Sequence, residues 1–288
     1  MPDRSPSAIL TVRCPDRKGI VASVTSFLAD NDATIVEATQ FNDPADNQFF
    51  MRLEFRADGE RLPDPAGFGS RFASLANAFA MEWRLREASF RSRTLIAVSR
   101  FGHCLVDLVS RWKSGALPID IVGIVSNHQD LRAFVEWNGL PFHYLPATPE
   151  TKAAQELKFR TLITSLSIEL VVLARYMQVL SPAFCADVSE RCINIHHSFL
   201  PSFKGARPYQ QAHARGVKII GATAHHVTCD LDEGPIIEQA VERVGHNHSA
   251  ADLIEIGRDI ESDVLARAVR RHAESRVMVH GSRTVVFR

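Results

Sequence analysis

The segment that most constrains the fold is the apolar run from residue 168 to residue 177, IELVVLARYM. A strand with one face in water alternates apolar and polar residues, whereas a near-continuous apolar run is typical of a strand whose sheet is covered on both faces. Short apolar segments alternate with amphipathic segments from residue 94 onward. This alternation predicts an α/β domain with a Rossmann-like, doubly wound and mostly parallel sheet.

The first 88 residues follow a different order. Amphipathic helical patterns follow the first and third of four strand-like segments, which gives the order β-α-β-β-α-β. We therefore expect a small ferredoxin-like domain at residues 1–88. Apolar periodicity lapses in the polar stretch at 89–93, which we interpret as a linker, and the second domain is expected at 94–288.

The composition of the chain narrows the class of partner. Lys plus Arg and Asp plus Glu both number 33, so no net charge favours nucleic acid or an anionic membrane. The five scattered cysteines contain no C-x-x-C pair, which argues against a disulfide framework and a zinc ribbon. The N-terminus lacks the pattern of a signal peptide, and no apolar run approaches the length of a membrane span. We expect a cytoplasmic protein that acts on a small molecule.

Asn194 and His196 are the first candidates for chemistry. They are two residues apart on an extended segment, so their side chains point to the same face. An asparagine amide can donate to a developing oxyanion, and an imidazole can transfer a proton near neutral pH. Asp230 and Asp232, on a loop between two predicted strands, each offer a carboxylate that could orient a catalytic histidine. This set indicates acid–base chemistry at a carbonyl centre.

Two pairs of adjacent histidines, His196–His197 and His225–His226, raise the question of a metal site. Neighbouring residues of a strand point to opposite faces, and the sequence contains no ligand cluster with zinc spacing. We therefore expect no metal and no cofactor. Two interpretations of the second pair stay open: one histidine lines the pocket, or one is buried and the other is solvated.

The segment from residue 193 to residue 239, with INIHHSFLP, GATAHHVT and LDEGPIIEQ, resembles the folate-dependent formyltransferase family. The resemblance implies that Asn194, His196 and Asp232 form the catalytic set. The upstream segment LARYMQVLSP resembles the folate-binding loop of that family. The substrate-binding residues implied in this way are Met177, Gln178, Val179, Leu180, Val227 and Thr228.

The opening CPDRKGIVASV and the β-α-β-β-α-β order resemble an ACT domain, an amino-acid-sensing module. The resemblance implies that an amino acid, glycine or methionine, binds near Asp16, Gly19 and Ile20, where unpaired helix N–H groups can receive a carboxylate. Asn31 and Asp32 replace the glycine that the family usually has before the second strand. Alternatively, the module only packs or dimerises. Because such modules join sheet edges, we expect a homo-oligomer, a dimer or tetramer.

Taken together, the two domains resemble the formyltetrahydrofolate deformylase family. The resemblance implies hydrolysis of 10-formyltetrahydrofolate to formate and tetrahydrofolate, with formate supplied to purine biosynthesis. In SRFGHCL, residues 99–105, bulky side chains replace the small residues with which related transferases bind a phosphate. Water is then the expected acceptor; the alternatives are formyl transfer to an amine and a non-catalytic regulator that binds a folate or an amino acid. Lys204 and Arg207 either contact the folate glutamate tail or belong to a solvated turn.

Overall fold

The computed structural model describes residues 7–58, 65–200 and 208–288. The chain divides into two compact units. The first unit contains residues 1–90 together with 274–278 and 285–288, and the second contains 91–273 and 279–284. The predicted division at 1–88, 89–93 and 94–288 assigned every C-terminal residue to the second domain. The two divisions therefore differ in the short C-terminal segments, and the second unit begins at Arg91, inside the predicted linker.

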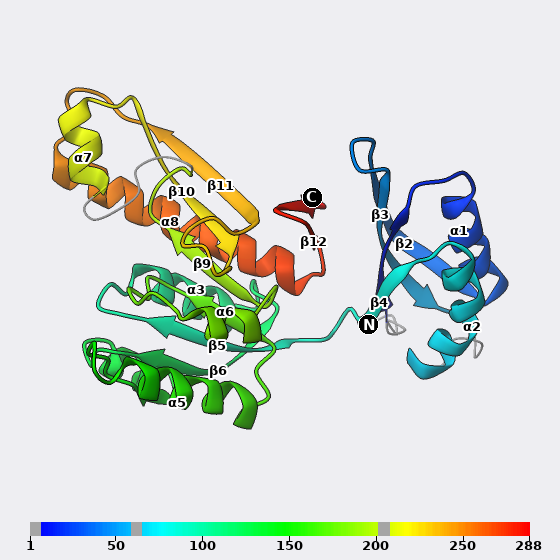
Figure 1. The fold of residues 1–288 in the computed structure, drawn as a ribbon, viewed down its shortest axis with the longest axis horizontal. Helices are drawn as coiled ribbons and strands as arrows, with labels where there is room; N and C mark the ends of the chain where they lie inside the picture. The colour runs from blue at the N-terminus through cyan, green and yellow to red at the C-terminus, as the bar shows by residue number, and fades with distance from the viewer. Residues whose placement is uncertain (1–6, 59–64, 201–207) are drawn as a thin grey trace. The chain divides into compact units, whose positions relative to one another are not determined.

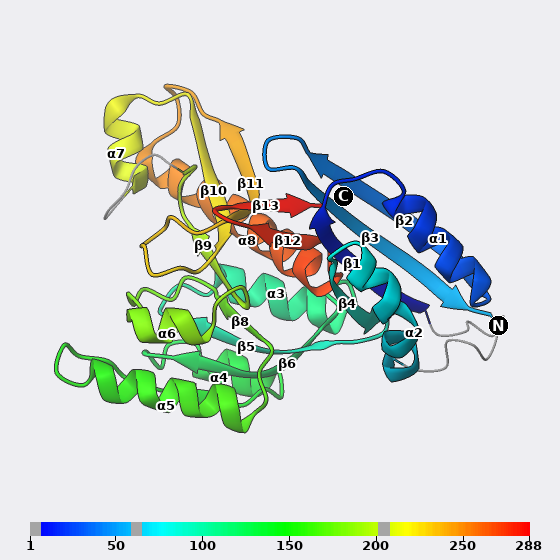
Figure 2. The same cartoon turned by 45° about the vertical axis from the view of Figure 1, so that its right-hand side comes forward.

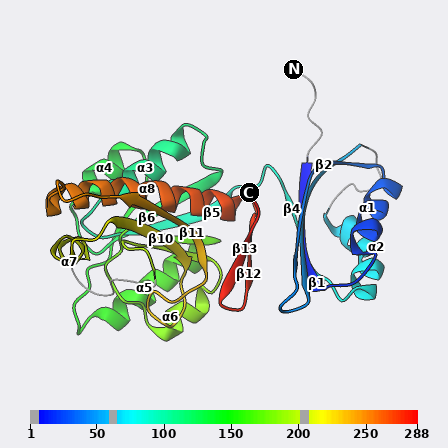
Figure 3. The ribbon, with the colours of Figure 1, turned by 90° about the horizontal axis from the view of Figure 1, so that it is seen from above.

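The first unit is a four-stranded antiparallel sheet with two helices, in the order β2-β3-β1-β4. Both helices lie on one side of this sheet (Figure 3). The predicted β-α-β-β-α-β order is confirmed. Its elements are β1 (Ser7–Pro15), α1 (Ile20–Asp30), β2 (Ala33–Asp43), β3 (Gln48–Ala57), α2 (Pro65–Ala78) and β4 (Glu82–Glu87).

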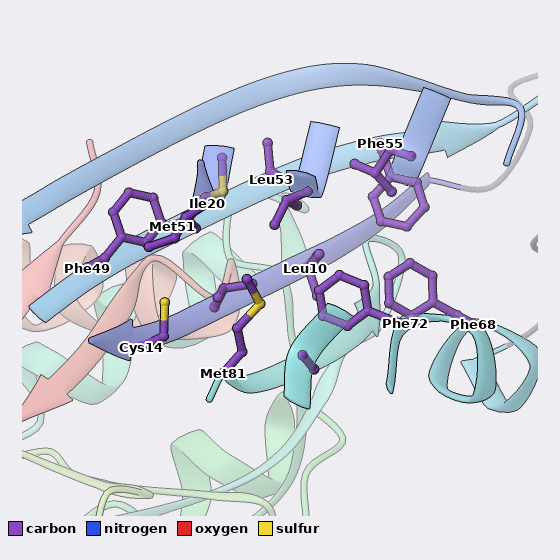
Figure 4. Packing of buried hydrophobic residues seen from close by; sticks show 14 residues of the cluster. Leu10, Cys14, Ile20, Phe49, Met51, Leu53, Phe55, Phe68, Phe72 and Met81 are labelled. Carbon is purple, nitrogen blue, oxygen red and sulfur yellow. The ribbon is translucent and has the colours of Figure 1, made fainter. Parts of the chain in front are cut away.

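Alternate residues of β1 and β3 form the core of the first unit. Leu10 and Leu53, from these two strands, are fully buried, and so is Phe72 of α2 (Figure 4). The rings of Phe68 and Phe72 stack with their centroids 5.2 Å apart. Burying a side chain of this size stabilises a fold by about 1.5–3 kcal/mol. This apolar face explains why the helices cover only one side of the sheet.

A charged cluster attaches the C-terminal segment to the first unit. Arg52 of β3 is only 1% exposed, and its Nη1 lies 2.7 Å from the Glu37 carboxylate. The Nε of Arg52 donates to the backbone carbonyl of Glu274 at 3.1 Å, and Arg276 Nη2 donates to Glu37 at 2.8 Å. Because the contacts made by Glu274 and Arg276 join residues more than 200 positions apart, no local sequence pattern marks them.

The second unit contains a seven-stranded sheet in the order β11-β10-β9-β8-β5-β6-β7. The five neighbouring strands β9, β8, β5, β6 and β7 are parallel, β10 pairs antiparallel with β9, and β11 pairs antiparallel with β10. The predicted mostly parallel sheet is confirmed. Its strands are β5 (Ser92–Val98), β6 (Ile119–Ser126), β7 (Phe142–Tyr144), β8 (Leu170–Leu173), β9 (Cys192–His196), β10 (Ile219–His226) and β11 (Ile236–Arg243). A C-terminal hairpin of β12 (Val277–His280) and β13 (Arg283–Val286) follows.

Helices cover both faces of this sheet. α3 and α8 lie on one side and α5 and α6 on the other (Figure 3), and α8 runs alongside β10 and β11 (Figures 1 and 2). No helix among the described residues is long and apolar enough to cross a membrane. The helices are α3 (His103–Lys113), α4 (Arg132–Trp137), α5 (Lys152–Ser165), α6 (Pro182–Asp187), α7 (Pro208–Arg215) and α8 (Ala250–Ala273).

The apolar run at 168–177 forms a shorter strand than its composition predicts. β8 contains only Leu170–Leu173, all four residues buried. Two residues later the backbone of Arg175 takes φ 62°, a left-handed conformation that a strand cannot accommodate. The remainder of the run therefore forms a loop at the carboxyl end of the sheet, where open α/β sheets bind ligands.

Candidate active site

Two paired strands position the candidate catalytic groups in the second unit. Asn194 and His196 of β9 point to the same face, as their spacing predicts. β10 pairs antiparallel with β9, with His225 opposite Asn194 and Thr223 opposite His196. Directly opposed residues project to the same face of a sheet, so His225 joins the pair. The Nδ2 of Asn194 lies 3.2 Å from the Nε2 of His225.

Asp232 reaches these groups from the loop between β10 and β11. Its backbone is left-handed, with φ 57°. Gly234 allows the loop to lie directly against β10, since a Cβ at this position would be 1.7 Å from the carbonyl oxygen of His226. The Asp232 Oδ2 is 3.1 Å from the Nδ1 of His196, and its Oδ1 is 3.5 Å from the Nδ2 of Asn194. The structure therefore brings together all three residues of the predicted catalytic set.

The hydrogen bonds define which ring nitrogens carry protons. His196 donates from Nδ1 to Asp232, so in the neutral ring the Nε2 holds a lone pair. This Nε2 is buried and has no hydrogen-bond partner among the described residues. His225 Nδ1 donates to the backbone carbonyl of His226 at 2.8 Å, which leaves its Nε2 as the acceptor facing Asn194. The arrangement provides one free base, the Nε2 of His196.

Asp232 remains ionised in this setting. Burial disfavours its charged form, but the hydrogen bond from His196 outweighs burial and holds the pKa of the Asp232 carboxyl well below its usual range. An ionised carboxylate beside Nδ1 favours the tautomer in which Nε2 is free, and it also stabilises the ring when it gains a proton. The carboxylate therefore orients His196.

A cavity of about 580 Å³ opens beside these groups. Asn194, His196, His225 and Asp232 line it, and so do all six predicted substrate-binding residues: Met177, Gln178, Val179, Leu180, Val227 and Thr228. Met177 and Val179 are each more than half exposed, so the loop after β8 presents apolar side chains. The Met177 N–H donates to the Oγ of Ser99 at 3.0 Å, which fixes the start of this loop. Lys204 and Arg207 lie outside the described residues.

The comparisons with known proteins agree with this geometry. The family model for formyl transferase matches residues 92–269, and the model for the ACT domain matches residues 8–62. A formyltetrahydrofolate deformylase from Corynebacterium sp. (strain P-1) is 50% identical over 97% of this chain and 98% of its own length. The chain belongs to the formyltetrahydrofolate deformylase family.

Solved structures support the same assignment. A formyltetrahydrofolate deformylase from Pseudomonas syringae pv. tomato str. DC3000 superposes with a TM-score of 0.95 at 48% identity, covering 99% of this chain and 95% of that one. A glycinamide ribonucleotide transformylase from Symbiobacterium toebii has a TM-score of 0.65 at 27% identity, covering 69% of this chain and 95% of its own. The predicted fold class and the predicted resemblance to deformylases are confirmed.

Sequence reasoning did not predict a polar network that lines the same cavity in this deformylase-family chain. Glu261 of α8 is 1% exposed; its Oε1 accepts from the Tyr209 hydroxyl at 2.7 Å, and its Oε2 accepts from the Nε2 of His103 at 2.8 Å. The ring of Tyr209 lies against Gly257, where a Cβ would be 2.2 Å from the ring. The Nε of Arg175 is 3.4 Å from Glu261. No local motif marks these residues, because they come from four separate elements or loops.

Part of this network also has the composition of a metal site. His103, Cys104 and Glu261 have ligand atoms within 4.8 Å of one another. Burial raises the pKa of the Cys104 thiol, which disfavours the thiolate that binds metals. Both oxygens of Glu261 already accept hydrogen bonds from neighbouring side chains. The hydrogen-bonded network therefore accounts for these groups without an ion.

The second histidine pair follows the first interpretation, because His225 lines the cavity. The second interpretation is wrong, since both residues are only 2% exposed and neither is solvated. The ring of His226 lies 5.8 Å from that of His272. Burial lowers the pKa of His226 to about 4, so it stays neutral near pH 7. Its role is in packing.

The three predicted effector residues lie together in the first unit of this deformylase-family chain. Asp16, Gly19 and Ile20 line a cavity of about 320 Å³. Gly19 precedes α1 with φ 94°, a conformation that glycine adopts without strain. Asn31 is not among the lining residues; its Nδ2 donates to the carbonyl of Phe27 at 2.8 Å. Asp32 takes φ 56° and thereby replaces the usual glycine at the bend.

Proposed function

We propose that this chain hydrolyses 10-formyltetrahydrofolate to formate and tetrahydrofolate. Its membership of the deformylase family supports the substrate and the reaction. The observation that carries the chemistry is the pair of Asp232 and His196, which leaves the Nε2 of His196 unprotonated at the wall of a cavity large enough for a folate ring system. A base in this position can activate water beside a bound formyl group.

The first step uses His196 as the general base. Its Nε2 takes a proton from water while the water oxygen attacks the formyl carbon, and Asp232 stabilises the imidazolium that forms. The Nδ2 of Asn194 donates to the oxyanion. In the free enzyme this group contacts both His225 at 3.2 Å and Asp232 at 3.5 Å. The longer contact is the weaker one, so Asn194 exchanges it for the oxyanion.

The second step breaks the bond between the formyl carbon and N10 of the folate. The imidazolium of His196 returns its proton to N10, which leaves as the amine of tetrahydrofolate. The carbon product is formic acid, which releases its proton to solvent as formate. Water, one base and one oxyanion donor are sufficient for both steps. We therefore propose that hydrolysis requires neither a cofactor nor a metal. Activity that survives exhaustive chelation would support this proposal.

The loop after β8 and the segment after β10 are proposed to hold the folate ring. Met177, Val179 and Val227 offer apolar surface to the faces of the pterin, and backbone groups of the same loop satisfy its polar edge. In the loop before α3, Phe101 lines the cavity and is 47% exposed, so it takes space that a phosphorylated acceptor would need. This supports water as the acceptor.

We further propose that the first unit binds an amino-acid effector, glycine or methionine, at the Asp16–Gly19–Ile20 cavity. The match to an ACT domain and the free N–H groups at the start of α1 support this. A homo-oligomer, dimer or tetramer, is supported by the edge strand β2, which exposes Val36 and Phe41. We place the enzyme in the cytoplasm, where its formate would enter purine biosynthesis.

One assay separates the functional alternatives. The purified protein is supplied with 10-formyltetrahydrofolate, and formate is quantified with and without glycinamide ribonucleotide, then with glycine or methionine added. Hydrolysis predicts stoichiometric formate whether or not the amine is present. Faster appearance of a formylated amine than of formate would instead show a transferase. Absence of both products, with the folate bound, would show a non-catalytic regulator.

A further inference from the structure

Arg175 has a left-handed backbone conformation that is unfavourable for a residue with a side chain. It lies two residues beyond β8, at the carboxyl end of the central sheet. Its φ of 62° places it in the left-handed region, which residues with a Cβ adopt at a cost. Glycine would occupy this position without strain. The presence of arginine therefore indicates that the guanidinium serves a purpose in the cavity that it lines.

The guanidinium of Arg175 is buried without enough hydrogen-bond acceptors. Its side chain is only 10% exposed, and its Nε and Nη1 have no hydrogen-bond partner among the described residues. Glu261, 3.4 Å from the Nε, balances the charge but already accepts from Tyr209 and His103. A buried arginine normally uses its planar set of donors on a carboxylate or phosphate. Two of the guanidinium nitrogens of Arg175 therefore lack a protein acceptor, in a side chain that lines the cavity.

The electrostatic surroundings favour a small anion. Arg258 also lines this part of the cavity, and the guanidinium carbons of Arg175 and Arg258 lie 5.8 and 5.7 Å from the ring centre of Phe101. His197 is neutral near pH 7, because burial lowers its pKa to about 4. Glu261 is the carboxylate in contact with Arg175, whereas Asp230 and Asp232 line the same cavity from the loop before β11. Beside Phe101, two guanidinium groups therefore accompany one contacting carboxylate.

This anion site and the catalytic set belong to one cavity. The ring of His197 lies 5.1 Å from the ring of His196 and 6.3 Å from the ring of Tyr209, which bonds to Glu261. A small molecule released beside His196 can therefore reach Arg175 without leaving the cavity. Formate is a planar carboxylate whose two oxygens match the two parallel N–H groups of a guanidinium.

We propose that Arg175 is a binding site for a small carboxylate and that its natural occupant is the formate released in the reaction. The origin of the ligand rests on the proposed function, whereas the binding site does not. Formate bound at Arg175 would occupy the cavity next to the reacting groups and act as a product inhibitor. Removing the guanidinium should weaken formate binding by about tenfold or more, as the loss of charge-assisted hydrogen bonds implies.

Two substitutions test the site in the full-length protein. Arg175→Gln removes the charge, and Arg175→Gly removes the side chain while suiting the left-handed backbone, so that at least one variant should fold. Arg267→Gln is the matched control, since Arg267 also belongs to the second unit but is 41% exposed and pairs with Asp263 at 2.9 Å on α8. Formate binding to the free protein is measured by saturation-transfer NMR, and formate inhibition from initial rates, both at constant ionic strength maintained with chloride.

The expected result is formate binding that chloride does not reproduce, weakened about tenfold in both Arg175 variants and unchanged in Arg267→Gln. Equal formate affinity in wild type and the Arg175 variants would overturn the proposal, as would a loss of turnover with formate affinity intact. Displacement of formate by inorganic phosphate at a lower concentration would assign the site to phosphate esters instead. If the protein bound formate through Arg175 but released none from the folate, the proposed function would fail and this site would stand.

Discussion

Replacement of Asp232 by asparagine is the sharpest test of the proposed chemistry. The substitution keeps the size of the side chain, but an amide that turns its NH₂ toward His196 forces the Nδ1 to accept, so the proton moves to the Nε2. The free base is then lost from the cavity. The substitution also removes the negative charge that stabilises the imidazolium during turnover.

The geometry gives the size of this effect. Two unit charges 3.1 Å apart attract by about 5 kcal/mol at an effective dielectric constant of about 20, a value suited to a pair as buried as His196 and Asp232. A loss of that size in the transition state corresponds to a decrease of about 10⁴ in kcat. The assay is formate release coupled to formate dehydrogenase, with circular dichroism to verify that the variant is folded.

Asp230→Asn provides the control, because Asp230 lies on the same loop but is exposed to solvent. Its loss of activity should be at least tenfold smaller than that of Asp232→Asn. A kcat for Asp232→Asn within about tenfold of the wild-type value would refute the reasoning. That result would mean that Asp232 does not stabilise a protonated His196 in the transition state.

Four further predictions follow from the same structure. Asn194→Ala should lower kcat by about 10²–10³ with the melting temperature nearly unchanged, and rates within a few-fold of wild type would remove the oxyanion role. Gly234→Ala places a Cβ 1.7 Å from the His226 carbonyl, so it should destabilise the protein in urea by about 1–3 kcal/mol or more and reduce activity; a stable, active variant would contradict this. The pKa of His226 is lowered from 6.5 to about 4, so only the unfolded chain gains this proton between those values, and stability should fall by about 3 kcal/mol as pH drops through that window. His226→Phe should reduce this pH dependence, and an unchanged slope would assign it to other groups. Glu37→Ala should cost about 1–3 kcal/mol because it leaves the buried Arg52 undercompensated, whereas Arg52→Met should be close to neutral; equal costs would contradict this.

The fold was largely predictable because each unit repeats one local pattern many times. Alternating and continuous apolar segments determine which strand faces are buried, and both sheets follow from them. The end of β8 was not predictable from hydropathy, since the apolar run continues through Tyr176 and Met177 while the backbone turns at Arg175. No sequence pattern indicates that an arginine has a left-handed backbone conformation, because this conformation is related to the cavity that Arg175 lines.

The catalytic set was predictable to different degrees for its different members. The spacing of Asn194 and His196 alone predicts a shared face, but only the family resemblance connected them to Asp232, which reaches them from 36 residues beyond His196. His225 could have been found from the register, since pairing β10 with β9 places it opposite Asn194. That register requires β10 to run antiparallel to β9. The prediction of a mostly parallel sheet does not identify β10 as an antiparallel strand.

The same structure shows why the sequence boundary at residue 94 does not separate the two units cleanly. Every group of the proposed catalytic set and of the Arg175 site lies between residues 91 and 273, so the chemistry belongs to one unit. The helix that carries Glu261 ends at Ala273, and the next residue, Glu274, already belongs to the other unit, where its carbonyl accepts from Arg52. Removing the first unit at the predicted linker would therefore leave Arg276 without the Glu37 carboxylate that stabilises its charge. A truncated protein that keeps only the second unit would therefore leave residues 274–278 without the sheet that they contact, which is formed more than 200 positions earlier in the chain.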